Sequence, residues 1–151
     1  MNVILDVDET LLTKKNDIII LRPYVREFIE TCFNVFKSVS IWTANTKEHF
    51  ESVYPKIREI MYENREFKHI FIEDKCQKQR IYRDEFGEYI YLVKDLTSIE
   101  HYFEGEIIII DDNPLANINN GKRCLLIKPF YGQENDTELI SVIDIINTLN
   151  D

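Results

Sequence analysis

The stretch NVILDVDETLL, residues 2–12, contains a short apolar run that ends in two carboxylates one residue apart. Residues 3–5 are predicted to form a buried strand, because a short continuous run of aliphatic residues is typical of one. Asp6 and Asp8 follow where that strand ends, and neither carboxylate contributes to the packing of a core. Ligands of α/β proteins collect at the carboxyl ends of parallel strands, so this stretch predicts a functional site as well as a strand.

The totals of the chain are those of an ordinary globular protein. Its 151 residues are expected to form one domain, residues 1–151, whose core needs no disulfide or metal for stability. The 18 Lys and Arg residues against 27 Asp and Glu residues give a net charge of −9. This charge argues against nucleic acid or an anionic membrane as the main partner. A phosphate-binding site would therefore have to concentrate positive charge locally.

The compartment and the redox state are predicted from what the sequence lacks. No stretch is long and apolar enough to span a bilayer, and the first strand begins too near Met1 for a targeting segment. Cysteines and histidines are dispersed, with no C-x-x-C pair: Cys32, Cys76, Cys124, His49, His69 and His101. We therefore expect an intracellular protein of the cytoplasm or nucleus, without a zinc site, that is a monomer or a weak dimer.

Helix and strand patterns alternate along the chain. Apolar residues at helical spacing over 25–36, with Cys32 among them, predict a helix with one buried face. Pro23 suits the first position of that helix. Before it, the polar stretch TKKND at 13–17 predicts a loop, and residues 18–21 form a short apolar run.

The pattern continues with SVSIWTAN at 38–45, which predicts a strand that ends at Thr43. A helix with an apolar face over 50–61 follows. Asn45 or Thr46 can cap its N-terminus, because both side chains accept hydrogen bonds from the first backbone N–H groups of a helix.

Residues 67–93 differ from the rest of the chain. The β-like runs HIFIE (69–73), QRIYR (79–83) and EYIYLV (88–93) flank DEFG at 84–87, which resembles a hairpin turn. We expect this segment to be a β-rich insertion.

The last part of the chain contains the clearest buried strand. EGEIIIIDDNP, residues 104–114, places four isoleucines directly before two aspartates. RCLLIKPF at 123–130 predicts another strand, and residues 139–149 predict an amphipathic helix. Strands that alternate with helices predict an α/β, Rossmann-like fold: a parallel sheet with helices on both faces, a small insertion and no large cap.

Polar residues end several of these elements. They form four groups in chain order: Asp6, Asp8 and Thr10; Thr43; Lys94; and Asp111 with Asp112. Each group alone has a simple explanation as a turn, a cap or a solvated side chain. Together, each at the end of an element, they favour a functional site at one edge of the sheet.

This set of residues is sufficient for phosphoryl transfer. Acids from two strands, with a backbone carbonyl, make an all-oxygen site that suits Mg²⁺. Asp6 can attack phosphorus and form an aspartyl-phosphate, while Asp8 can protonate the leaving oxygen and later deprotonate the attacking water. Thr43 offers its hydroxyl and backbone N–H to the phosphoryl oxygens. Lys94 provides a positive charge that is expected to keep Asp6 ionised.

Four stretches together resemble the motifs of the haloacid dehalogenase (HAD) superfamily: ILDVDETLL, IWTAN, VKDL and IIIIDDNP. More narrowly, LDVDETLL, LRPYVREFI, SIWTANTKEHF and LVKDLTSI resemble the small CTD-phosphatase (NLI-interacting-factor-like) family. That family includes phosphatases that act on the RNA polymerase II tail. The resemblance spans nearly the whole chain, from Asn2 to about Phe130.

The resemblance implies a role for each matching position. Asp6 would be the nucleophile and Asp8 the general acid and base. The phosphate-binding residues would be Thr43, Ala44 and Lys94. Mg²⁺ would be held by Asp6, the Asp8 carbonyl and Asp112, with Asp111 acting through water or Lys94. The family has no large lid over its site, so the implied substrate is phosphoserine or phosphothreonine in an extended polypeptide.

Several positions depart from the family pattern and leave the substrate open. Asn16 stands ten residues after Asp6, where the family has an aromatic residue that shelters a proline of the substrate, and His49 matches a partner aromatic position. Glu73 stands where an Arg is common. Basic residues of the hairpin are candidates to replace that Arg: Lys75, Lys78, Arg80 and Arg83. A Ser-Pro polymerase tail is therefore expected only from the resemblance.

Three other functions compete with that of an active phosphoprotein phosphatase. A receiver domain of a signalling protein also has acids, a Thr, a Lys and Mg²⁺, but it carries adjacent acids on its first strand and a lone Asp on a middle strand. A catalytically weak binding module of the same fold remains an alternative, although each position that the chemistry needs carries a suitable residue. A phosphatase for a nucleotide or another small molecule is a third reading, and such relatives usually carry a larger cap.

Overall fold

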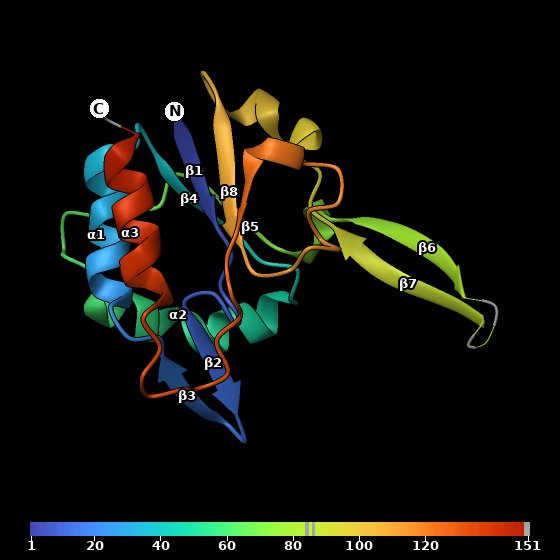
Figure 1. Ribbon diagram of the computed structural model, residues 1–151, viewed down its shortest axis with the longest axis horizontal. Coiled ribbons are helices and arrows are strands. Elements are labelled where there is room, and N and C mark those ends of the chain that lie inside the picture. Colours follow the sequence, from blue (N-terminus) through green and yellow to red (C-terminus); the bar gives the residue numbers. More distant parts are fainter. Residues whose placement is uncertain (84, 86, 150–151) are drawn as a thin grey trace.

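The computed structural model describes residues 1–83, 85 and 87–149, and its centre is a parallel sheet of five strands (Figure 1). The strands lie in the order β5-β4-β1-β8-β9. Their bounds are β1 (Asn2–Leu5), β4 (Val39–Trp42), β5 (Ile70–Phe71), β8 (Ile107–Asp111) and β9 (Cys124–Leu126). Every pairing in this sheet is parallel, which confirms the predicted α/β fold.

The two faces of the sheet belong to two apolar clusters. Side chains alternate along a strand, so Val3 and Leu5 of β1 face one cluster and Ile4 faces the other. Three α-helices cover the first face: α1 (Val25–Val35), α2 (Lys47–Ile60) and α3 (Glu138–Thr148). The second face is covered by short 3₁₀ helices, η2 (Leu96–Ser98) and η3 (Glu100–Tyr102), so helices lie on both faces, as predicted.

The helices have the predicted apolar faces but not always the predicted ends. Cys32 is buried in the core, as the spacing predicted. The Thr46 side chain caps α2 by accepting a hydrogen bond from the His49 N–H at 3.1 Å, one of the two predicted caps. Pro23 is not in the first turn of α1, because Tyr24 intervenes with a left-handed φ of 67° and the helix begins at Val25. None of the helices among the described residues is long and apolar enough to cross a membrane.

A hairpin follows β1 where the sequence predicted a loop. Strands β2 (Leu12–Lys15) and β3 (Ile18–Leu21) pair antiparallel, so three residues of the TKKND stretch are in a strand. Asn16 and Asp17 form the turn with φ values of 50° and 65°. Positive φ at both central residues matches the right-handed twist of a hairpin, and Asn and Asp tolerate it better than most residues.

The β-rich segment begins later than predicted. Ile70 and Phe71 form β5, which pairs in parallel with β4 and belongs to the central sheet. The insertion is therefore the hairpin of β6 (Gln77–Arg83) and β7 (Gly87–Val93), which projects from the body of the molecule (Figure 1). The predicted DEFG turn falls on residues 84 and 86, outside the described residues. Two further 3₁₀ helices are η1 (Glu73–Lys75) and η4 (Gly121–Arg123).

Candidate active site

All seven residues predicted for the site line one small cavity at the carboxyl edge of the sheet. Its volume is about 140 Å³. The seven residues are Asp6, Asp8, Thr43, Ala44, Lys94, Asp111 and Asp112. They come from four segments, which follow β1, β4 and β7 and end β8. The parallel order of the central strands therefore brings together groups that are up to 106 residues apart in the sequence (6 to 112).

Lys94 is the buried cation of the cavity. Its Nζ donates to Asp6 Oδ1 at 2.8 Å and to Asp111 Oδ2 at 2.7 Å. Its backbone carbonyl accepts from Asn120 Nδ2 at 2.7 Å, and its N–H donates to the Ala116 carbonyl at 2.7 Å. Burial lowers the pKa of Lys94, but the charges of Asp6 and Asp111 raise it more, so the net shift is upward. The lysine is therefore held charged between two carboxylates.

Three carboxylates converge beside this lysine. Asp6, Asp111 and Asp112 each have an oxygen within 4.8 Å of the others. Thr10 Oγ1 lies 3.0 Å from Asp6 Oδ2 and 3.1 Å from Asp112 Oδ1, and its single proton serves one of them at a time. Burial and the charge of Asp111 raise the pKa of Asp6 well above its ordinary value, although the charge of Lys94 lowers it in part. Lys94 therefore favours the ionised form of Asp6, in the predicted direction, against the opposing effects of burial and Asp111.

The excess of negative charge fits a divalent cation. Three carboxylates face one lysine, and Mg²⁺ prefers oxygen ligands of this kind. Burial also raises the pKa of Asp112, as expected for acids that lack a cation partner. The Asp8 carboxylate is not part of this group of three, so the contribution expected from Asp8 is its backbone carbonyl.

The Asp8 carboxylate is held by two side chains near the start of α2. Asn45 Nδ2 donates to Asp8 Oδ2 at 2.8 Å, and His49 Nε2 lies 2.6 Å from Asp8 Oδ1. From the sequence, His49 is expected to be a dispersed histidine at a partner aromatic position, and its contact with Asp8 is not predicted. A signal was present, because Thr46 caps a helix that starts at the site edge, and His49 therefore lies in its first turn.

The end of β4 supplies a hydroxyl and a free backbone N–H. Thr43 is buried, and its hydroxyl oxygen accepts from the Asn45 N–H at 3.1 Å. The Thr43 N–H was predicted to bind phosphate, but it donates to the Phe71 carbonyl of β5 at 3.0 Å. The next N–H, that of Ala44, has no acceptor among the described residues, and Ala44 is one of the residues that line the cavity.

Arg22 fixes the loop that carries the site acids. Its guanidinium is buried and donates to the Thr10 carbonyl at 3.2 Å and to the Lys128 carbonyl at 2.7 Å. It also makes a bidentate pair with Asp136 at 2.8 and 3.1 Å. In the sequence this arginine stands out only as part of the LRPYVREFI motif. The structure shows that it ties the loop after β1 to the loop before α3.

The basic residues expected to replace a missing arginine do not reach the cavity. Among the described side chains, Lys75, Lys78 and Arg80 are exposed and do not line it. Lys75 donates to the hydroxyl of Tyr102 at 3.3 Å, and Arg80 pairs with Glu88 at 3.0 Å. The side chain of Arg83 lies outside the described residues.

Comparisons with known proteins agree with this geometry. The family model of the NLI interacting factor-like phosphatases matches residues 1–151. The chain belongs to this family. A relative, "Putative CTD phosphatase-like protein 355R" of Invertebrate iridescent virus 6, is 25% identical over 132 residues, which cover 83% of this chain and 72% of the relative.

A solved structure confirms the fold of this family member. The "putative beta-phosphoglucomutase" of Thermotoga maritima superposes with a TM-score of 0.56. The match covers 99% of this chain and 98% of the other at 12% identity, so it supports the HAD-like fold and not a shared substrate. Family and fold together identify the chain as a phosphatase of the HAD superfamily.

Proposed function

We propose that this chain is a Mg²⁺-dependent phosphatase that hydrolyses phosphomonoesters through an aspartyl-phosphate on Asp6. The observation that carries the proposal is the convergence of Asp6, Lys94 and Ala44 on one small cavity. Membership of a phosphatase family supports the reaction class. The proposed substrate is phosphoserine or phosphothreonine in a polypeptide such as the RNA polymerase II tail.

The first step forms the acyl phosphate. A carboxylate oxygen of Asp6 bonds to phosphorus as the bond from phosphorus to the serine or threonine oxygen breaks. Protonated Asp8 gives its proton to that leaving oxygen, and the alcohol departs. Thr43, Ala44 and Lys94 offer a hydroxyl, an N–H and a positive charge to the phosphoryl oxygens.

The second step restores the enzyme. Ionised Asp8 takes a proton from a water molecule, whose oxygen bonds to phosphorus while the bond to Asp6 breaks. Asp6 is released as a carboxylate, inorganic phosphate leaves, and Asp8 is again protonated for the next cycle. Asn45 and His49 hold the two Asp8 oxygens and so orient the group that transfers both protons.

The proposed metal ligands are Asp6, Asp111, Asp112 and the Asp8 carbonyl. When bound, Mg²⁺ would neutralise the clustered carboxylates and offset charge on the phosphoryl group. In the absence of a cation, Asp6 carries a raised pKa because burial and its acidic neighbour disfavour the ionised form. Bound Mg²⁺ would add to the positive charge of Lys94 and would favour the ionised form of Asp6.

The size of the cavity supports a substrate whose bulk lies outside it. Pockets for small molecules usually have volumes of about 300–1,000 Å³. The active cavity measures about 140 Å³, which suits a phosphoryl group and not a whole nucleotide or sugar. A phosphorylated side chain that projects from a polypeptide suits a cavity of this size, because only its phosphoryl group has to enter. The relative named for a CTD phosphatase supports the polymerase tail as one example.

The test is phosphate release from p-nitrophenyl phosphate by the purified protein with Mg²⁺, with EDTA, and by Asp6→Asn. We expect turnover that needs the metal and that Asp6→Asn loses, while circular dichroism shows an unchanged fold. Absence of turnover from folded, Mg²⁺-loaded protein would instead favour a binding module. Full activity of Asp6→Asn would contradict the proposed nucleophile.

A further inference from the structure

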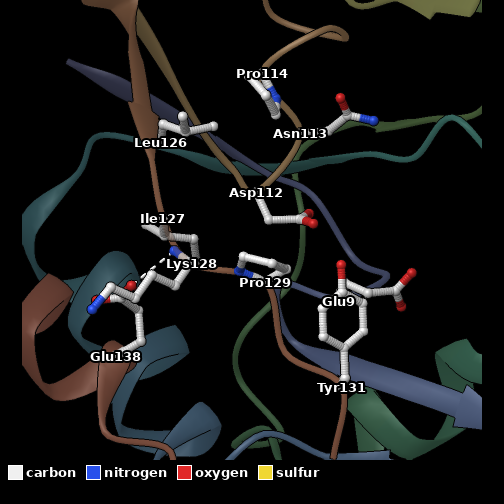
Figure 2. A pocket seen from close by; sticks show the side chains of 10 residues that line it. All are labelled: Glu9, Asp112, Asn113, Pro114, Leu126, Ile127, Lys128, Pro129, Tyr131 and Glu138. Carbon is white, nitrogen blue, oxygen red and sulfur yellow. Dashed lines mark hydrogen bonds between the residues drawn. The ribbon is translucent and has the colours of Figure 1, made fainter.

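A groove opens directly beside the active cavity (Figure 2). Its volume is about 770 Å³. This side groove is formed by residues 112–114 after β8, by Leu126 at the end of β9, by residues 127–129 and 131 after it, and by Glu9 and Glu138. Glu9, Asp112 and Asn113 also line the active cavity. A ligand that places a phosphoryl group in the cavity can therefore extend into the side groove.

The walls of the side groove are held in place by hydrogen bonds. The Phe130 N–H donates to the Glu9 carbonyl at 2.8 Å, which fixes the segment that carries Tyr131 against the site loop. The Lys128 N–H donates to Glu138 at 2.7 Å, and the Lys128 carbonyl accepts from Arg22 at 2.7 Å. The groove is thus largely formed before a ligand arrives, which lowers the entropic cost of binding.

The surface of the groove combines exposed apolar groups with an excess of negative charge. Tyr131 is 55% exposed and Leu126 is 52% exposed. With Asp112 assigned to the cation, the charges that remain are Glu9 and Glu138 against Lys128, a net charge of −1. Figure 2 shows the Glu9 carboxylate and the Tyr131 ring at the same end of the groove, where the Phe130 hydrogen bond brings their backbones together.

An aromatic ring beside a carboxylate is suited to a basic side chain. The ring attracts the cation through its face, and the carboxylate pairs with it. The aliphatic stem of Lys or Arg can cover apolar surface such as that of Leu126 and Tyr131. A further phosphate, as in a nucleoside diphosphate, would meet net negative charge in the same groove.

We propose that the side groove binds the substrate polypeptide next to the phosphorylated residue and favours Lys or Arg there. This inference rests on the proposed phosphatase function. It names a specificity site that lies on the β8–β9 side of the cavity, at the end of the groove formed by Glu9 and Tyr131. The phosphoryl group occupies the cavity of about 140 Å³, and a flanking basic residue occupies the larger groove.

The test compares phosphoserine peptides that differ at one position. For each position one or two residues before or after the phosphoserine, three peptides carry Arg, Ala or Glu at that position. We expect kcat/KM for the best Arg peptide to exceed that for its Glu counterpart by about five- to tenfold at low salt, from one exposed ion pair and one cation–π contact. The ratio should shrink as ionic strength rises.

Substitutions of groove residues test whether the groove causes the preference for Arg over Glu. Glu9→Gln and Tyr131→Ala should each lower the Arg-to-Glu ratio toward one. The matched controls Glu104→Gln and Tyr62→Ala change exposed side chains outside the groove and should keep the ratio. Both peptides are measured on the same preparation of each variant, so a loss of folded protein cancels from the ratio.

Equal kcat/KM for the Arg, Ala and Glu peptides, with normal turnover of p-nitrophenyl phosphate, would overturn the inference and leave the proposed function standing. An unchanged Arg-to-Glu ratio of kcat/KM in both groove variants would also overturn the inference. A nucleoside monophosphate or sugar phosphate hydrolysed faster than every peptide would assign the groove to a small molecule. No turnover of any ester would overturn the proposed function itself.

Discussion

At the residue scale, the chemistry depends on how each carboxylate is held. Asp6 is bound by Lys94 and Thr10 in a buried position, which suits a nucleophile that must keep one orientation. Asp8 is partly exposed and is bound by Asn45 and His49, which suits a group that exchanges protons with substrate and water. The two acids therefore have different roles because they have different partners.

Asp8→Asn should slow the hydrolysis of phosphoserine peptides by about 10²–10⁴-fold, because a general acid contributes roughly that factor. The rate of p-nitrophenol release in the first turnover should fall less, because p-nitrophenolate can leave without receiving a proton from Asp8. Rapid-mixing kinetics with both esters measure this difference. An equal loss for the two leaving groups would contradict the assignment of Asp8 as the acid.

His49→Ala should lower kcat for phosphoserine peptides by about tenfold and kcat for p-nitrophenyl phosphate by less, because His49 orients the Asp8 carboxyl at 2.6 Å. KM should change little. His101→Ala removes an exposed histidine outside the site and serves as the control. A uniform loss with every ester, or no loss at all, would show that His49 does not position Asp8.

At the scale of elements, the loop after β1 is held in place by the residue that follows the β2–β3 hairpin. Arg22 follows β3 directly and reaches the carbonyls of Thr10 and Lys128 and the carboxylate of Asp136. It thus connects the loop after β1 to the segment between β9 and α3, both of which contribute residues to the side groove. This contact explains why an arginine next to a proline precedes α1 in a chain whose chemistry does not use it.

Arg22→Ala should lower the free energy of unfolding by about 3–5 kcal/mol, because it leaves Asp136 and two carbonyls without a buried partner. Arg22→Lys should recover only part of this loss, since a lysine cannot make the bidentate pair. Urea denaturation measures both variants. Arg26→Ala, which changes an arginine stacked on exposed Tyr62, is the control and should cost far less. Similar losses for Arg22 and Arg26 would contradict this account.

At the scale of the whole molecule, an acidic chain of net charge −9 concentrates three carboxylates around one lysine. Bound Mg²⁺ should therefore stabilise the fold, by about 2.7 kcal/mol at a free concentration one hundred times its Kd. Thermal unfolding with Mg²⁺ and with EDTA measures the effect.

Asp112→Asn should reduce the stabilisation by Mg²⁺ and should stabilise the metal-free protein, because it removes one of the repelling charges. Glu104→Gln, an exposed carboxylate that pairs with Lys37, should leave the metal effect unchanged. An identical unfolding temperature with saturating Mg²⁺ and with EDTA would contradict the proposed metal site.

The sequence predicted the central sheet and the site because both depend on local patterns. Apolar runs such as residues 107–110 form buried strands in this fold, and polar residues that end parallel strands must meet at one edge. The residues that were missed depend on tertiary contacts. The Thr43 N–H is bound because β5 joins the central sheet, and residues 70–71 alone do not reveal that pairing. Tyr24 displaces Pro23 from α1 through its left-handed backbone, which no helix pattern indicates.

The central claim is that Asp6 carries the phosphoryl group, and one measurement tests it directly. Asp8→Asn mixed with p-nitrophenyl phosphate and Mg²⁺ should complete the first step and stall before hydrolysis, because no base activates the water. Acid quenching followed by peptide mass spectrometry should then find one phosphoryl group on Asp6, together with a burst of p-nitrophenol equal to the amount of enzyme. Continued turnover by wild-type protein with no phosphoryl group ever found on Asp6, in either protein, would contradict the account.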